Sequence, residues 1–185
     1  MRSPLVCVFC VASIAAQPLR AQRGEFQAGV VAAYGTAPAY GPGAGLVLGV
    51  APGRLAYLGL RWTYYFGVSE QRGSAPTDVL TKAQVIGVDL GVEIPVGAVE
   101  VFPGVSVGWN QFTQHASQPT SSGSSHEFFG APGVAVELRI ARLGLIPELQ
   151  YVWAGEPDIP WPIQHEGFVF SLRCVILGEV RRIRR

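Results

Sequence analysis

Apolar positions alternate with small or polar positions along most of the chain, and this two-residue period is typical of β-strands with two chemically different faces. Between residues 99 and 109 the odd positions are apolar, whereas the even positions are mostly small or polar. The same alternation recurs in other segments. The pattern predicts eight strands, at residues 25–34, 43–50, 55–66, 83–94, 99–109, 133–140, 143–153 and 167–176.

The connections between these predicted strands alternate strictly between short and long. The short ones are residues 51–53, 95–98 and 141–142, and the long ones, rich in Gly, Pro, Ser and Thr, are residues 35–42, 67–80, 113–126 and 154–163. Transmembrane barrels join their strands in this way, with tight turns in the periplasm and longer loops outside the cell. An even number of strands then places both ends of the barrel in the periplasm.

Aromatic residues gather where the predicted strands meet the long connections. Amphipathic rings prefer the level of the lipid headgroups, so we expect them to form the outer girdle of a barrel. The expected girdle residues are Tyr34, Trp62, Tyr64, Trp109, Phe129, Tyr151 and Trp153, together with Tyr65, Phe66, Phe112 and Phe128.

The composition favours a membrane protein, with 49% hydrophobic and 15% charged residues, whereas charged residues average about 25% in soluble domains. After the N-terminal stretch no apolar run approaches the roughly 18 residues of a membrane-spanning helix. A soluble lipocalin-type barrel is the alternative, but the face opposite the Val, Leu and Ile positions holds mainly Gly, Ala and Ser, which suits a narrow lumen better than a water-facing surface. We therefore predict an all-β fold, an eight-stranded antiparallel up-and-down transmembrane β-barrel in the outer membrane of a Gram-negative-type bacterium.

The two ends of the chain predict export and a basic tail. Residues 1–21 resemble a cleaved signal peptide with an apolar run from Leu5 to Ala16; residues 22–178 form the barrel, and residues 179–185 form an arginine-rich periplasmic tail. Removing Arg2 and Arg20 from 14 basic residues leaves 12 against 13 acidic ones, which gives no reason to expect a nucleic-acid partner. Cys174 would then be the only cysteine, so no disulfide is expected.

Eight charged residues fall on the predicted lumen face. Buried together in a narrow barrel they would have to pair, because an isolated charge in a low dielectric is costly. We interpret them first as a structural network that plugs the lumen, and an ion or proton path through the lumen is the alternative. These residues are Arg61, Asp89, Glu93, Glu100, Glu137, Arg139, Glu148 and Arg173.

Near the C terminus, His165-x-Gly167-x-x-Phe170-x-Leu172 is similar to the assembly signal that the outer-membrane insertion machinery reads in last strands. With the pattern above, the chain from Arg23 to about Gly178 resembles the eight-stranded outer-membrane barrels of the OmpA transmembrane-domain type and the OmpX or opacity-protein type. The resemblance implies a structural, adhesive or surface-interaction role rather than open-pore transport. It ends at the last strand, where those families usually stop with an aromatic residue and this chain continues.

We expect the long connections to carry the function, because loops on a rigid scaffold commonly carry recognition. This predicts a non-enzymatic protein whose partners are outer-membrane lipid, the barrel assembly machinery and an extracellular ligand, with no cofactor or metal. The alternative is a lipid A-modifying enzyme, in which a rim histidine, His126 or His165, would activate a serine. The rim residues for such chemistry are several serines within 117–125 and His115, His126, Glu127, His165 and Glu166.

Overall fold

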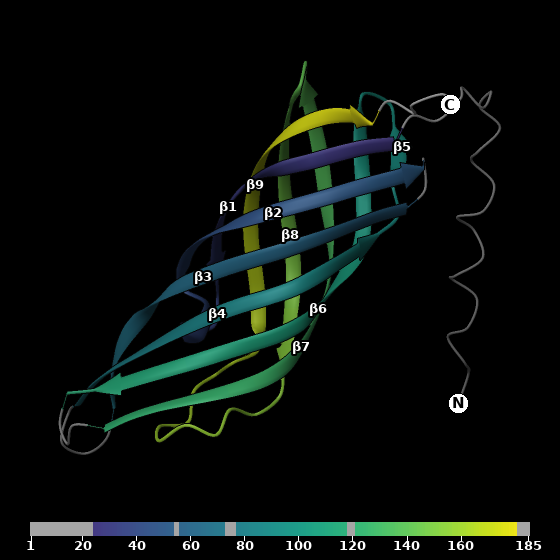
Figure 1. Ribbon diagram of the computed structural model, residues 1–185. Helices are drawn as coiled ribbons and strands as arrows, with labels where there is room; N and C mark the ends of the chain where they lie inside the picture. The colour runs from purple at the N-terminus through teal and green to yellow at the C-terminus, as the bar shows by residue number, and fades with distance from the viewer. Residues whose placement is uncertain (1–23, 54–55, 73–76, 118–120, 181–185) are drawn as a thin grey trace, which may run out of the picture.

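The computed structural model describes residues 24–53, 56–72, 77–117 and 121–180, and it shows a barrel of antiparallel strands (Figure 1). A 3₁₀ turn, η2 (Pro38–Tyr40), lies between the first two strands. The all-β prediction is confirmed. The strands are β1 (Gly24–Gly35), β2 (Pro42–Gly53), β3 (Ala56–Arg72), β4 (Thr77–Gly91), β5 (Ile94–Val96), β6 (Val99–Ala116), β7 (Ser121–Ile140), β8 (Leu143–Ala154) and β9 (Gly167–Val180).

Eight of these strands close the barrel. Strands that follow one another pair antiparallel, β4 pairs with β6, and β1 pairs with β9 along its whole length. The remaining strand, β5, is three residues long and pairs with the start of β6, in the connection where Gly97 takes a left-handed conformation with φ of 64°. Where all eight strands pair, the closed ring leaves no unpaired strand edge, as a membrane protein built from strands requires.

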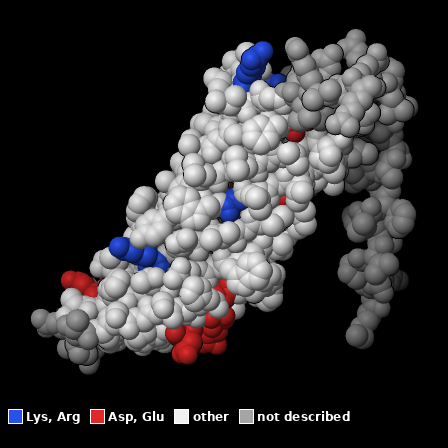
Figure 2. Space-filling view, in the orientation of Figure 1, with Lys and Arg blue, Asp and Glu red and all other residues white. Residues whose placement is uncertain are grey.

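Side chains face outward and inward in the alternation that the sequence predicts. On β4, Ile86 and Leu90 are about half exposed, whereas Val85 and Asp89 on the opposite face are buried. The outer surface is therefore a belt of large apolar side chains, and the middle of the face seen in Figure 2 is almost free of charge. Such a surface is favourable in the hydrocarbon layer of a membrane and unfavourable in water. The predicted outward face is confirmed.

Two of the predicted long loops are mostly strand. β3 stays paired with β4 out to Arg72 and Thr77, and β6 stays paired with β7 out to Ala116 and Ser121. Because β4 and β6 also remain paired there, the four strands continue past the rest of the barrel as one sheet, at the lower left of Figure 1. The prediction of loops at 67–80 and 113–126 is therefore wrong for most of their residues. We call this sheet the extension, formed by residues 66–72, 77–82, 112–116 and 121–126.

The other two predicted loops fold back onto the barrel rather than projecting from it. Residues 35–42 enter its mouth, where Ala39 and Tyr40 are fully buried. Residues 155–166 cross the inner face of the extension, and the backbone of Trp161 donates to and accepts from the side chain of Gln114, at 2.8 and 2.9 Å. The first segment buries side chains in the barrel, and the second packs Ile163 against the buried core, which a freely projecting loop would not do.

The predicted aromatic girdle divides into outward and inward residues. Tyr64 is half-buried on the outer face. By contrast, three of the predicted residues are at most 5% exposed and point into the lumen, namely Tyr65, Phe112 and Phe129. The prediction is wrong for these three because successive side chains of a strand point to opposite faces. On β7 the lipid-facing residue is Phe128, so Phe129 faces the lumen, and the same alternation turns Tyr65 and Phe112 inward. The remaining predicted girdle residues are 39–65% exposed on the outer face: Tyr34, Trp62, Phe66, Trp109, Phe128, Tyr151 and Trp153.

The predicted signal peptide at residues 1–21 lies outside the described residues, as does the tail from residue 181 onward. The last strand continues to Val180, two residues beyond the predicted end of the barrel. Where the chain is described, none of its helical segments has the length and apolar character needed to cross a membrane.

Candidate functional site

Four charged side chains from four strands meet in the middle of the lumen, and we call them the central cluster: Arg61 (β3), Asp89 (β4), Glu148 (β8) and Arg173 (β9). Arg61 lies 2.7 Å from Asp89 and 2.8 Å from Glu148. Arg173 forms an ion pair with Glu148 and lies 3.6 Å from Asp89. All four are at most 9% exposed, and two guanidinium groups balance two carboxylates.

Uncharged side chains complete the hydrogen bonds of the central cluster. The hydroxyl of Ser106 donates to Asp89 and accepts from the amide of Gln150 at 2.7 Å. The hydroxyl of Ser171 donates to Glu148, also at 2.7 Å. These residues were not predicted, although each lies on the lumen face that alternation assigns. Because buried carboxylates are favourable only when their remaining lone pairs are satisfied, these neutral donors are part of the same unit.

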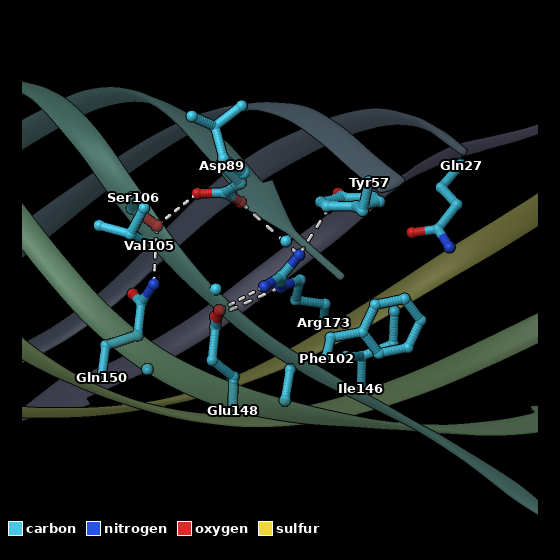
Figure 3. A pocket seen from close by; sticks show the side chains of 15 residues that line it. Gln27, Tyr57, Asp89, Phe102, Val105, Ser106, Ile146, Glu148, Gln150 and Arg173 are labelled. Carbon is cyan, nitrogen blue, oxygen red and sulfur yellow. Dashed lines mark hydrogen bonds and ion pairs between the residues drawn. The ribbon is translucent and has the colours of Figure 1, made fainter. Parts of the chain in front are cut away.

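Tyr57 extends the central cluster along the lumen, as Figure 3 shows with Arg173 between Asp89, Tyr57 and Glu148. Its hydroxyl accepts from Arg173 at 3.4 Å, and the guanidinium lies 5.9 Å from the ring centroid, within the range of a cation–π contact. A Cβ placed on Gly49 or Gly59 would come within 2.7 Å of the tyrosine hydroxyl. These two glycines therefore make room for the ring inside the barrel.

A second group of charges lies at the mouth of the barrel where the short connections lie, and we call it the mouth cluster: Glu25, Glu93, Glu100, Glu137 and Arg139. Arg139 lies 2.9 Å from Glu137, 3.1 Å from Glu25 and 3.7 Å from Glu100. The side chain of Arg139 is 42% exposed, whereas that of Glu137 is buried. One guanidinium therefore faces four carboxylates. The sequence had predicted one buried network, and the structure divides it into two groups of different exposure.

Glu93 shows the excess of negative charge at the mouth. It lies outside the strands, in the connection from β4 to β5. Burial raises the pKa of Glu93 to about 7, with help from the carboxylates of Glu100 and Glu137 and against the influence of Arg139. Glu100 and Glu137 are also directly opposite each other on neighbouring strands, where like charges are destabilising. The mouth cluster thus contains repulsion that the central cluster lacks.

Aromatic side chains fill the lumen toward the end that carries the extension, and we call them the aromatic cluster: Tyr40, Tyr65, Phe112 and Phe129. The ring of Tyr40 lies edge-on to Tyr65 at 5.3 Å between centroids and 6.2 Å from Phe112. Its hydroxyl accepts a hydrogen bond from the buried amide of Asn110. The 3₁₀ turn η2 carries Tyr40 into this position, so a connection predicted to be exposed contributes to the core.

Little free space remains around the central cluster. The cavity lined by Tyr57, Asp89, Glu148 and Arg173 has a volume of about 30 Å³, which is room for one or two water molecules. This agrees with the general geometry of barrels, in which eight strands enclose an interior just wide enough for side chains.

The structure places His115 and Ser122 opposite each other on the outer face of β6 and β7, but among the described residues no hydrogen bond joins a rim histidine to a serine or a carboxylate. His126 faces outward on β7, whereas its neighbours Ser125 and Glu127 face inward and are hydrogen-bonded to each other. His115 also faces outward, and Nδ1 of His165 lies 3.1 Å from the carbonyl oxygen of Ile163. Within the described ranges, no three His, Cys, Asp or Glu side chains are placed to hold a metal ion.

No family model matches the sequence, and no curated protein matches it. Solved structures do match. A major outer membrane protein of Thermus thermophilus has a TM-score of 0.65 at 13% identity, with 85% of this chain and 99% of that chain covered. The N-terminal β-barrel domain of OprF from Pseudomonas aeruginosa has a TM-score of 0.52 at 12% identity, covering 85% and 98%. Neisserial surface protein A has a TM-score of 0.52 at 15% identity, covering 85% and 97%.

At these identities the likeness concerns the fold, which is that of small outer-membrane barrels, as the sequence predicted. The apolar belt on the outer face agrees with it, because that belt is suited to lipid. By its fold and its surface, the chain is a β-barrel of the small outer-membrane type with a lipid-compatible outer face.

Proposed function

We propose that this outer-membrane barrel is a closed, non-enzymatic scaffold that presents an interaction surface at its extracellular end. The observation that carries the proposal is the filling of the lumen. The central cluster and the aromatic cluster lie one after the other inside it, and the cavity around the central cluster is about 30 Å³. A hydrated ion would have to separate the ion pairs of the central cluster and move the buried rings.

Separating those ion pairs is energetically expensive. Arg61 contacts both Asp89 and Glu148, and removing one partner from a buried pair typically destabilises a protein by about 3–5 kcal/mol. The four strands that carry the central cluster are also fixed by continuous backbone pairing around the barrel. Both facts support a lumen that stays closed.

The interaction surface consists of the extension and residues 155–166. Glu156 and Asp158 are exposed there, and acidic side chains gather at the lower end of the view in Figure 2. The hydrogen bonds between Trp161 and Gln114 fix residues 155–166 against the sheet, so a partner would meet a preformed surface, which lowers the entropic cost of binding. The exposed carboxylates suit a partner with basic groups.

The test is a binding assay with cells that display the protein. Wild-type cells should bind to immobilised extracellular-matrix proteins or to polylysine, and the double variant Glu156→Gln, Asp158→Gln should bind several-fold less. Glu100→Gln is the matched control, because this carboxylate lies at the opposite end of the barrel and cannot meet an extracellular partner. Binding no higher than that of cells without the protein, or equal loss in both variants, would contradict the proposal.

The non-enzymatic part of the proposal has its own test. Lipid A from cells that express the wild type is compared by mass spectrometry with lipid A from cells that express His126→Ala, His165→Ala. We expect identical lipid A, because His126 faces away from Ser125 and Glu127. A modification that appears with the wild type and disappears with the double variant would show that the protein is an enzyme.

A further inference from the structure

The outer face of β4 and β6 changes from apolar to polar along one line, whereas on β3 exposed apolar side chains continue beyond it with Phe66 and Val68. Ile86 on β4 pairs with Trp62 on one side and Trp109 on the other, and Ile86 and Trp109 are the last large apolar side chains before polar ones follow on the outer face of β4 and β6. The next outward pair beyond them is Gln84 and Gln111. Because tryptophan rings prefer the headgroup level of a membrane, the polar side chains beyond this line lie among the headgroups of the outer leaflet.

A groove opens in the outer face at this level. Its volume is about 140 Å³, which holds several water molecules and accommodates a group as large as a phosphate. His115 is exposed, and the other polar side chains around the groove are half-buried. The lining polar side chains are Tyr64, Lys82, Gln84, Gln111, Thr113 and His115.

The chemistry of this lining favours an anion. Lys82, the only lysine in the sequence, lies opposite Thr113 across the β4–β6 pair. An ammonium group, amide N–H groups and a hydroxyl are all hydrogen-bond donors, and a histidine adds one more when it is protonated. The groove lining contains no carboxylate. On β4 the outward-facing acid is Asp78, four residues from Lys82 and outside the lining.

We propose that this groove binds a phosphate group of a lipid A headgroup, with Lys82 as the cation and Gln84, Gln111 and Thr113 as neutral donors. The depth of the groove selects this source, because the groove begins where the apolar belt ends and the anions of the outer leaflet at that depth are lipid A phosphates. The site is separate from the extracellular interaction surface proposed above, and it would hold the barrel at a fixed depth and rotation in the leaflet.

The single lysine allows a direct test. In the folded protein in detergent micelles, an acetylating reagent modifies Lys82 and the N-terminal amine, and peptide mass spectrometry reads both rates. Adding diphosphoryl lipid A should slow the acetylation of Lys82 about fivefold, the size of effect of one lysine beside an anionic lipid surface. The N-terminal amine is the internal control, and its rate should not change.

Two further arms identify the source of the effect. Dephosphorylated lipid A should give little protection, and equal protection by it would overturn the proposal, since acyl chains alone would then cover Lys82. Inorganic phosphate without lipid should also give little protection. If it protects as well as diphosphoryl lipid A, the groove holds a free anion and the assignment to a lipid is wrong.

Variants test the same site by a second measurement, the retention of lipid A in native mass spectrometry. Lys82→Gln should retain about fivefold less diphosphoryl lipid A, while Lys82→Arg should retain as much as the wild type. Arg142→Gln, which removes an exposed charge from the turn between β7 and β8 at the other end of the barrel, is the matched control. Heat-modifiable gel mobility verifies that each variant is folded, and wild-type retention by Lys82→Gln would overturn the proposal.

Discussion

The central cluster and the mouth cluster are built from the same kinds of side chain, but they differ in balance and exposure. In the central cluster, two guanidinium groups face two carboxylates and all four are buried. In the mouth cluster, one half-exposed guanidinium faces four carboxylates. Deep in the barrel, protein groups must neutralise each charge because there is too little space for water to solvate it. At the mouth, solvent screens the charges, so an excess of carboxylates over guanidinium groups is tolerated.

The largest effect is expected from breaking the central cluster. Arg61→Ala leaves Asp89 and Glu148 with Arg173 as their only remaining cation within the described contacts, and we expect a loss of about 3–5 kcal/mol in the free energy of unfolding. Urea unfolding in micelles, followed by tryptophan fluorescence, measures it. Arg142→Ala, on an exposed turn, is the control. A loss below about 1 kcal/mol would mean that the central cluster is solvated like a surface ion pair.

A smaller effect is expected from a neutral member of the same unit. Ser106→Ala removes a donor from Asp89 and an acceptor from Gln150, and leaving such buried groups unsatisfied should cost about 1–3 kcal/mol. Ser69→Ala, at an exposed position of β3, should change little when measured by the same unfolding assay. Equal values for the two variants would show that water replaces the lost hydroxyl inside the lumen.

At the mouth, the expected change has the opposite sign and depends on pH. The folded state raises the pKa of Glu93 to about 7, so the folded protein binds more protons than the unfolded chain between the two pKa values, and its stability falls as the pH rises through that window. Glu93→Gln removes this penalty. After discounting for solvent screening, we expect it to stabilise the barrel by about 1 kcal/mol at pH 8 and to have no effect at pH 4. Destabilisation at pH 8 would show that the carboxylate has a favourable partner.

The smallest effect is expected from Glu100→Gln. This carboxylate lies 3.7 Å from Arg139, and both side chains are about 40% exposed, so the pair should contribute at most about 0.5 kcal/mol, partly offset by repulsion from Glu137. Unfolding at low and high salt is the measurement, and the small difference should vanish at high salt. A loss of several kcal/mol at either salt concentration would remove the contrast between the two clusters.

Much of the fold could be predicted because lipid imposes a strict chemical difference between the two faces of each strand. The extension could not, because beyond the headgroups both faces of a strand can be polar and the alternation disappears. Residues 121–125 therefore look like a flexible loop in sequence, although they pair with residues 112–116 as part of a continuous hairpin. The backbone pairing that defines this hairpin is not encoded in the polarity of its side chains.

The sequence predicts which charged residues face the lumen, but it does not predict how they are arranged there. The alternation along each strand places all four residues of the central cluster on the lumen face. The height of each residue in the barrel depends on strand register and tilt, which no pattern in the sequence specifies. The inward position of Phe129 could have been predicted from the alternation along β7. Extending the parity of Val134 and Leu138 back along β7 makes Phe128 the outward residue, but the predicted strand began at residue 133.

The central claim, a closed lumen, is tested most directly by single-channel recording in planar bilayers with the purified wild-type barrel. We predict a stable baseline without conductance steps over the range of voltages that a bilayer withstands, because ions would have to cross both the central cluster and the aromatic cluster. Steady, large and reproducible steps from wild-type protein would contradict the claim and would make the charged residues of the lumen an ion path rather than a seal.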